Sequence, residues 1–385
     1  MRRLLVVASA VVLVDSILYA ALTPLLPRYV DEYDLTKGGA GLLVGAYAAG
    51  ALVGGLPGGL AAARLGARTA AVAGLMTVAA ASVVFGVAGD PWLLGAARFV
   101  QGLGSALSWS GALTWLVTAA PRERRAEMIG TALGVAIAGA MLGPVLGAVA
   151  EVSGEAMAFG GVALAATLLA GIALRVPGTP PERADVRALG RALTGRRLLA
   201  GFWLVTLPAL LFGLLAVLAP LELSALGWSA VAIGALWLVT AGIESAMNPF
   251  LGRLVDRRGR LLPVQGALVA SPAVLLGLAW AGSEPLYAAL VVASGVAFGA
   301  MFTPGMALLS DAAERAGVAQ ALAFGATNAA WAVGNLVGPA GGGALASVAG
   351  DESAYAAAAG LAVLTLAGVW RHALTAGTRA SSAAG

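Results

Sequence analysis

Two short sequence signatures each occur twice in this chain, about half its length apart. One runs from Gly139 to Gly147 as GAMLGPVLG and returns from Gly334 to Gly342 as GNLVGPAGG. The other runs from Gly59 to Arg68 as GLAAARLGAR and returns from Gly252 to Leu261 as GRLVDRRGRL. Internal repeats of this kind are typical of membrane proteins built from two similar parts. The chain is therefore predicted to fold as two related bundles.

The composition places most of the chain in lipid. Charged residues make up 11% of the sequence, whereas soluble domains carry about 25%. An apolar helix needs about 20 residues to cross the bilayer core, so 385 residues allow twelve spans with short loops. We predict an all-α integral membrane protein with twelve transmembrane helices in two pseudo-symmetric six-helix bundles. The predicted spans are 4–26, 39–63, 69–88, 91–118, 127–149, 156–176, 199–220, 229–251, 261–281, 285–309, 318–347 and 353–373.

The longest polar stretch divides the chain. It covers residues 177–198 and holds three prolines and several arginines, so it is predicted to be a linker between an N-terminal half, 1–176, and a C-terminal half, 199–385. The apolar run after Met1 has the full length of a span. It carries Asp15 and no small-residue cleavage site, so a first span is favoured over a signal peptide.

The positions of the basic residues predict the orientation of the spans. Of the 23 lysines and arginines, all but three fall in segments that the twelve-span topology places on the side of the N-terminus. The three exceptions are Arg28, Arg98 and Lys37, the only lysine of the chain. Basic residues collect in cytoplasmic loops, so both termini are predicted to be cytoplasmic. The net charge of +4 then follows from topology and does not indicate nucleic-acid binding.

Several kinds of chemistry are excluded by residues that the chain lacks. There is no cysteine, and His372 near the C-terminus is the only histidine. Disulfides, thiolate metal sites and a Ser/His triad within the membrane are therefore impossible. We expect no metal, no cofactor and no enzymatic activity.

Two acids lie within predicted spans and are the first candidates for function. Acidic residues are expensive in a membrane and mark functional sites by default. Asp15 is followed four residues later by Tyr19, and Glu244 is followed four residues later by Asn248, so each pair shares a helix face. The alternative for either acid is a structural hydrogen bond to a neighbouring helix.

Two further spans carry polar stripes. Arg98 and Gln101 share one face with Ser105 and Ser108. Since arginine does not give up its proton, we expect Arg98 to bias the neighbouring carboxylate of Asp15; the alternative is that it reaches toward the headgroups. The second stripe consists of Asn328, Trp331 and Asn335.

The repeated loop signature resembles the G-x-L-a-D-r-x-G-r-r motif of the major facilitator superfamily. The second copy matches at Gly252, Leu254, Asp256, Arg257, Gly259 and Arg260. The first copy keeps Gly59, Arg64, Gly66 and Arg68 but has Ala63 in place of the motif's Asp. The resemblance implies a cytoplasmic latch in which Asp256 faces the positive start of the fifth span. The corresponding latch at Ala63 is expected to be weaker or absent.

Three other segments carry the same resemblance over almost the whole chain. The stretch Arg98–Gly104 resembles the family's R-x-x-q-G-x-g motif, and Asp15–Pro27 resembles the first helix of its twelve-helix drug:proton antiporters. The last segment resembles the g-x-x-x-G-P-x-x-G motif of antiporters, with gating positions Gly139, Gly143, Pro144 and Gly147 and a second copy at Gly334, Gly338 and Pro339. These resemblances imply a monomeric carrier of the bacterial cytoplasmic membrane.

The resemblance implies proton-coupled efflux of small amphiphilic or cationic compounds by antiport with alternating access. Protons, the small-molecule substrate and the lipid bilayer are then the expected partners. A second interpretation is export or uptake of a neutral metabolite such as a sugar or amino acid. A third, from another class, is a membrane sensor that does not transport.

Overall fold

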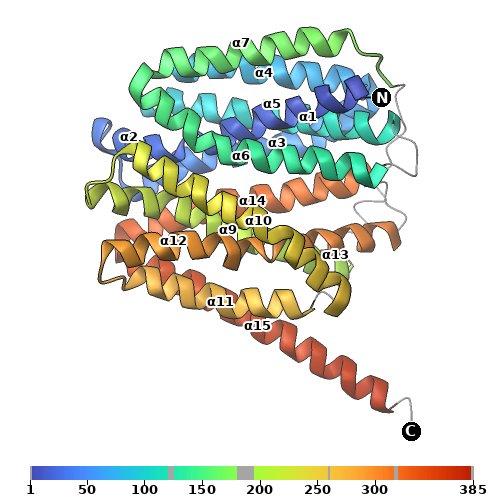
Figure 1. Ribbon diagram of the computed structural model, residues 1–385, viewed down its shortest axis with the longest axis vertical. Helices are drawn as coiled ribbons and strands as arrows, with labels where there is room; N and C mark the ends of the chain where they lie inside the picture. The colour runs from blue at the N-terminus through green and yellow to red at the C-terminus, as the bar shows by residue number, and fades with distance from the viewer. Residues whose placement is uncertain (1, 120–124, 180–194, 259–260, 316–319, 383–385) are drawn as a thin grey trace.

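The computed structural model describes residues 2–119, 125–179, 195–258, 261–315 and 320–382 (Figure 1). All regular structure in these residues is helical, as the sequence predicts. The elements are α1 (Arg2–Ala20), η1 (Thr23–Leu25), α2 (Leu26–Glu32), α3 (Lys37–Leu65), α4 (Ala67–Gly86), α5 (Pro91–Ala119), α6 (Arg125–Ser153), α7 (Glu155–Leu174), α9 (Arg196–Ala225), α10 (Ala230–Arg258), α11 (Leu261–Ala279), α12 (Glu284–Gly299), α13 (Phe302–Arg315), α14 (Gln320–Ala349) and α15 (Asp351–Ser382).

The twelve predicted crossings correspond to these elements, with two differences. The first predicted span is not one helix: α1 ends at Ala20, and the chain continues through η1 and α2. Pro24 lies in the break, and a proline lacks the N–H group that would continue the helix. The tenth predicted span is likewise divided into α12 and α13.

Most crossings are long and apolar enough to span a membrane on their own. Ten segments of the described residues meet that requirement, including α1 to α2 and α12 to α13 taken as continuous segments. The other two crossings are α5 and α14, with 29 and 30 residues. Their sequences are less apolar because they carry polar residues such as Arg98 and Asn335. The candidate site therefore lies on these two crossings, which fall short of that requirement, and on the broken first helix.

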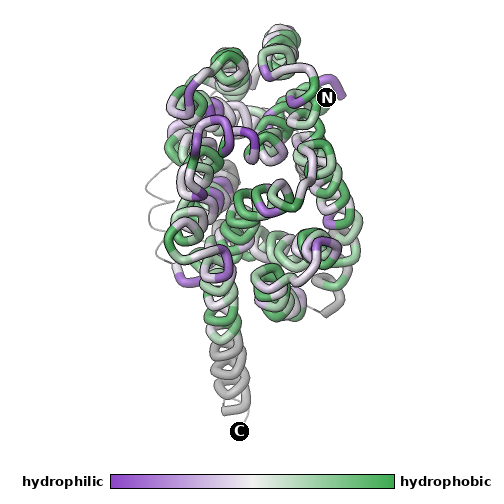
Figure 2. Tube along the Cα trace, turned by 90° about the vertical axis from the view of Figure 1, so that its left-hand side faces the viewer, coloured by the Kyte–Doolittle hydropathy of each residue, from purple (hydrophilic) through white to green (hydrophobic). Residues whose placement is uncertain are grey.

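The crossings end at two opposite faces. The terminal face contains the start of α1 and the ends of α3 and α7, and both chain ends lie on this side in Figure 1. The distal face contains the turns at Tyr33–Thr36, Leu226–Ser229 and Gly350. Figure 2 looks onto the distal face, where the turns are mostly hydrophilic and the helices behind them mostly hydrophobic.

Following the sequence prediction, we call α1 to α7 the N-bundle and α9 to α15 the C-bundle. In the N-bundle, α1 packs on α6, α5 packs on α3 and α4, and α4 packs on α7. In the C-bundle, α9 packs on α13 and α14, and α15 packs on α11. The main contacts between the bundles join α3 to α14 and α6 to α10. The boundary of the two halves at 177–198 stays a prediction, because 180–194 lie outside the described residues.

The repeated glycine signature packs in the same way in both bundles. A Cβ atom on Gly139 would lie 2.7 Å from the carbonyl oxygen of Leu13, so α6 touches the backbone of α1. A Cβ atom on Gly334 would lie 2.7 Å from the backbone nitrogen of Leu210, so α14 touches α9. Glycines allow helix backbones to approach this closely in a membrane. The signature therefore fixes the first helix of each bundle.

The prolines of the two signatures lie at the contact between the bundles. The carbonyl oxygen of Pro144 lies 3.0 Å from where a Cβ atom on Gly234 of α10 would be. The carbonyl oxygen of Pro339 similarly faces Gly41 of α3. Each signature helix thus packs on its own bundle through glycines and on the other bundle through the carbonyl group of its proline. This arrangement is compatible with the gating role that the sequence predicts for Pro144 and Pro339, which remains a prediction.

Replacing Gly143 by alanine is expected to destabilise the protein. The new Cβ atom would lie 2.8 Å from the carbonyl oxygen of Ile17 and against the side chain of Ala20. Such overpacking costs about 1–3 kcal/mol. Gly134→Ala on the same helix is the matched control, because no atom lies within 4 Å of its Cβ position. Thermal unfolding in detergent measures the effect, and equal melting temperatures for the two variants would contradict it.

Candidate functional site

Asp15 lies near the middle of the first crossing and is 1% exposed. The hydroxyl of Ser108 on α5 donates a hydrogen bond to its Oδ2 atom. Within the described part of the chain, its Oδ1 atom has no hydrogen-bond partner. The hydroxyl of Tyr47 on α3 donates to the backbone oxygen of Asp15 at 3.4 Å. A carboxyl group therefore sits in the N-bundle with one free oxygen.

Arg98 makes no ion pair with this carboxyl group among the described residues, and its predicted influence on Asp15 stays a prediction. Its guanidinium donates to the carbonyl oxygens of Leu18 at 2.9 Å and Tyr19 at 3.1 Å. No ion pair within 4 Å joins Arg98 and Asp15 among the described residues. The reason is the end of α1 at Ala20, because the last four carbonyl groups of a helix lack partners within the helix. Arg98 satisfies two of them.

The alternative prediction for Arg98, that it reaches toward the headgroups, differs from the structure. Its side chain is 2% exposed, and its guanidinium carbon lies 4.7 Å from the centre of the Tyr47 ring. It donates to Gln101 at 3.2 Å, and Gln101 donates to Ser82 on α4 at 3.2 Å. The charge is therefore held by carbonyl groups, an amide and an aromatic face inside the N-bundle.

Tyr19 reaches across to the C-bundle. Its hydroxyl donates to the Oδ1 atom of Asn335 on α14. Its ring lies 4.7 Å from that of Trp331, edge to face, and 5.6 Å from that of Tyr47. The amide of Asn335 donates to the backbone oxygen of Trp331 at 3.2 Å. The structure thus brings together Tyr19, Trp331 and Asn335, whereas Asn328 lies two turns away on α14 and makes none of these contacts.

Glu244 is a separate position on α10. Its carboxyl carbon lies 2.8 Å from where a Cβ atom on Gly299 would be, so it packs directly on α12. The structure gives it no hydrogen bond or ion pair among the described residues. The side chain of its predicted neighbour Asn248 lies outside the described residues. Asp15 and Glu244 therefore belong to different bundles and do not form one carboxylate pair.

Solved membrane carriers share the fold of this chain. The human organic anion transporter MFSD10 (TETRAN) is 18% identical, with a TM-score of 0.73 over 96% of this chain and 99% of that chain. The nucleoside transporter NupG, as a point mutant, is 12% identical, with a TM-score of 0.75 over 96% and 99%. At these identities the likeness concerns the fold alone.

A bacterial homologue of the human lysosomal transporter Spinster, in an inward-facing and unoccupied conformation, is 15% identical, with a TM-score of 0.73 over 95% of this chain and 94% of that chain. No curated protein sequence matches the chain. The sequence profile of the Major Facilitator Superfamily matches residues 8–334. The chain belongs to the Major Facilitator Superfamily. Its predicted membership of the drug:proton antiporters stays a prediction.

The superfamily's loop signature is described only in its first copy. Arg64 is exposed, and Gly66 has φ 91° at the sharp turn between α3 and α4, a region that favours glycine. Arg68 donates to the carbonyl oxygens of Leu174 at 3.3 Å and Val176 at 3.1 Å, which caps the end of α7. In the second copy, Gly259 and Arg260 and the side chains of Asp256 and Arg257 lie outside the described residues, as does the side-chain environment of Gly252.

The sequence analysis did not predict the contacts of two residues of the site, Ser108 and Tyr47. Ser108 shares the helix face of Arg98, but its bond to Asp15 has no sequence signal. Tyr47 lies in a run of small residues on α3, and nothing there indicated its contact with Arg98 or the backbone of Asp15.

No group of three or more potential metal ligands occurs in the described residues.

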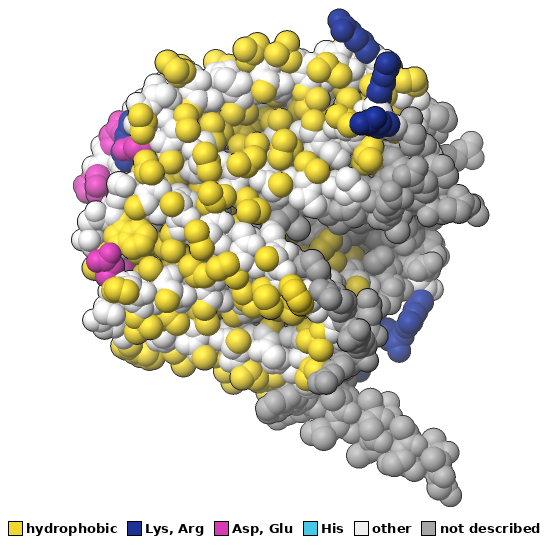
Figure 3. Space-filling view, viewed as in Figure 1, with side chains coloured by type: hydrophobic (Ala, Val, Ile, Leu, Met, Phe, Trp, Pro, Cys, Tyr) yellow, Lys and Arg dark blue, Asp and Glu magenta, His cyan; other side chains and the backbone are white. Residues whose placement is uncertain are grey.

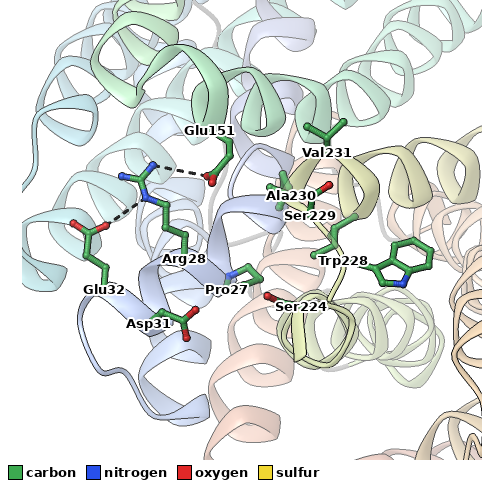
Figure 4. A pocket seen from close by; sticks show the side chains of 12 residues that line it. Pro27, Arg28, Asp31, Glu32, Glu151, Ser224, Trp228, Ser229, Ala230 and Val231 are labelled. Carbon is green, nitrogen blue, oxygen red and sulfur yellow. Dashed lines mark ion pairs between the residues drawn. The ribbon is translucent and has the colours of Figure 1, made fainter. Parts of the chain in front are cut away.

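The distal face has a cavity that the sequence did not predict. Its volume is about 580 Å³, and it lies between α2 and α6 of the N-bundle and α9 and α10 of the C-bundle (Figure 4). Arg28 on its wall forms ion pairs with Glu32, Glu151 and Glu155 at 3.2–3.8 Å. Trp228 forms part of the opposite wall. Arg28 thereby ties the end of the first crossing to α6 and α7.

Replacing Arg98 by methionine is expected to lower thermal stability in detergent. The carbonyl groups of Leu18 and Tyr19 would lose their partner, and each unsatisfied buried group costs about 1–3 kcal/mol. Arg98→Lys should restore part of the stability, because an ammonium group can reach one of the two carbonyls. Arg64→Met is the control, since Arg64 is exposed. If the Arg98→Met and Arg64→Met variants unfold at the same temperature, Arg98 does not cap α1.

Proposed function

We propose that this protein is a proton-coupled secondary transporter that works by alternating access, with Asp15 as its proton-binding residue. The observation that carries the proposal is the environment of Asp15. The carboxyl group is buried, accepts one hydrogen bond from Ser108 and has one oxygen without a partner among the described residues. Within those residues, no cation lies close enough to form an ion pair with it.

An isolated carboxylate is unstable in an apolar interior. It favours the protonated form while the site is sealed, and it can release the proton when water reaches it. Because Arg98 is held by carbonyl groups, its charge does not permanently neutralise Asp15. Asp15 can therefore exchange a proton each time the site changes its access. Glu244, the second candidate, is the only other acid that the sequence places inside a span.

We propose efflux of small amphiphilic or cationic compounds as the transport activity. The clustered rings of Tyr19, Tyr47 and Trp331 support this, because aromatic faces bind apolar groups and cations. The alternative is transport of a neutral metabolite. The near-complete burial of Asp15 favours that alternative, because it leaves the acid available to protons rather than to a substrate. The similar solved carriers, an organic anion transporter and a nucleoside transporter, support neither choice over the other.

We place the terminal face in the cytoplasm of a bacterium and the distal face outside. In Figure 3 the visible Lys and Arg side chains lie mainly toward the terminal face, and the Asp and Glu side chains lie toward the distal face. Exposed arginines of the terminal face include Arg2, Arg3, Arg64, Arg175 and Arg196. Cytoplasmic loops of membrane proteins carry such an excess of positive charge. The proposed working unit is a monomer.

Replacing Asp15 by asparagine is expected to abolish proton exchange. In everted vesicles with an acidic lumen, a transported cationic amphiphile should alkalinise the lumen with native protein and have no effect with Asp15→Asn. Asp34→Asn is the matched control: Asp34 is exposed and has φ 48°, a conformation that asparagine tolerates. A panel of cationic and neutral compounds identifies the substrate class. Alkalinisation that persists in Asp15→Asn would contradict the role of Asp15.

A response to neutral compounds alone would support the alternative substrate class. If no compound moves protons and the two Asp variants behave like the native protein, proton-coupled transport is wrong for this chain.

A further inference from the structure

One ion pair joins the two bundles within the described residues. The Nζ atom of Lys37, the first residue of α3, lies 2.5 Å from the Oδ1 atom of Asp351, the first residue of α15. The side chains are 37% and 20% exposed, so solvent reaches both. Every other ion pair of the described residues is centred on Arg28 and stays inside the N-bundle. Lys37, which makes this contact, is the only lysine of the chain.

Next to the ion pair in the sequence, α3 and α14 are in close contact. The amide nitrogen of Gly38 donates to the hydroxyl of Ser347 at 2.8 Å, and a Cβ atom on Gly38 would lie 3.4 Å from the Cα atom of Ala344. One helical turn on, Gly343 faces the carbonyl group of Lys37 and Gly41 faces that of Pro339. At Gly38, Gly41 and Gly343 the backbones of α3 and α14 therefore approach closely.

A glycine turn positions the acidic partner. Gly350 has φ 84°, which ends α14 and starts α15 at Asp351. Asp351 is then at the positive N-terminus of α15, where a carboxylate is stabilised. Asp34 lies three residues before Lys37 but makes no ion pair in the described structure, and neither does Glu352 beside Asp351. Lys37 thus has one acidic partner, and that partner belongs to the other bundle.

We propose that Lys37 and Asp351 form a latch that holds the distal ends of the bundles together. The proposal rests on the alternating access put forward above: when the distal ends separate, α3 moves away from α14 and the ion pair breaks. The second seam, between α6 and α10, has no ion pair among the described residues; its contacts include that of Pro144 with Gly234 and a hydrogen bond from the hydroxyl of Ser245 to the sulfur of Met141. The latch therefore biases the equilibrium toward the distal-closed state.

The size of the bias follows from the exposure of the pair. A partly exposed ion pair changes a two-state population by up to about fivefold. The free energy of such an ion pair is small compared with the stability of a fold, but it matters for the populations of two conformations of similar free energy. Removing either charge should increase the distal-open population by about twofold to fivefold. The latch therefore sets how often the distal side opens without sealing it permanently.

Pulsed electron spin resonance distances test the latch directly. The chain has no cysteine, so Trp92→Cys and Leu286→Cys introduce two unique labelling sites. Both residues are exposed at the distal ends of α5 and α12, which belong to different bundles. In reconstituted full-length protein, Asp351→Asn and Lys37→Met should each raise the long-distance population about twofold to fivefold. The exchanged pair Lys37→Asp with Asp351→Lys should return it toward the native value.

Glu352→Gln is the matched control, because it removes the neighbouring acid without touching the ion pair. Distances that respond equally to Asp351→Asn and Glu352→Gln, or that respond to neither, would overturn the latch. Failure of the exchanged pair to restore the native distribution would also overturn it. The distances require no substrate and no proton movement. They can therefore fail while the Asp15 vesicle assay succeeds, and the reverse also holds.

Discussion

The carbonyl groups of Leu18 and Tyr19 need partners because α1 ends inside the apolar interior of the protein. No water replaces a missing helical hydrogen bond at that depth, so the break is tolerated only where protein groups supply it. Arg98 provides both bonds from α5. This fixes α5 against α1, and it brings Ser108 to Asp15. The position of the proton-binding candidate therefore depends on a charge that does not touch it.

The glycine-proline signature performs a second, related task. Its glycines allow α6 to lie on the backbone of α1, which carries Asp15 and Tyr19. The carbonyl group of its proline faces the opposite bundle, and the copy on α14 repeats both contacts with α9 and α3. The repeat thus explains why two helices far apart in the sequence occupy equivalent places. It also means that the helices bearing the signature are the ones that connect each bundle's first helix to the other bundle.

The fold could be predicted from the sequence because span length, low charge and the repeated signatures are local properties. The break after Ala20 was not predicted, although Pro24 signals it, so the two carbonyl partners of Arg98 were not predicted either. An arginine and an acid on facing helices suggest an ion pair, but free carbonyl groups compete for the same donor. Which one wins depends on where α1 ends to within one turn. Ser108 and Tyr47 could not be assigned because their contacts are between helices.

The site and the distal face are linked mechanically by α14. Asn335, which accepts a hydrogen bond from Tyr19, and Ser347, which accepts one from Gly38, are on the same helix, about 18 Å apart along its axis. Both bonds join α14 to the N-bundle. A rigid movement of α14 that opens the distal contact with α3 must therefore also strain or break the bond to Tyr19. Because Tyr19 is one turn from Asp15 on α1, the change in access and the surroundings of the acid change together, which coupled transport requires.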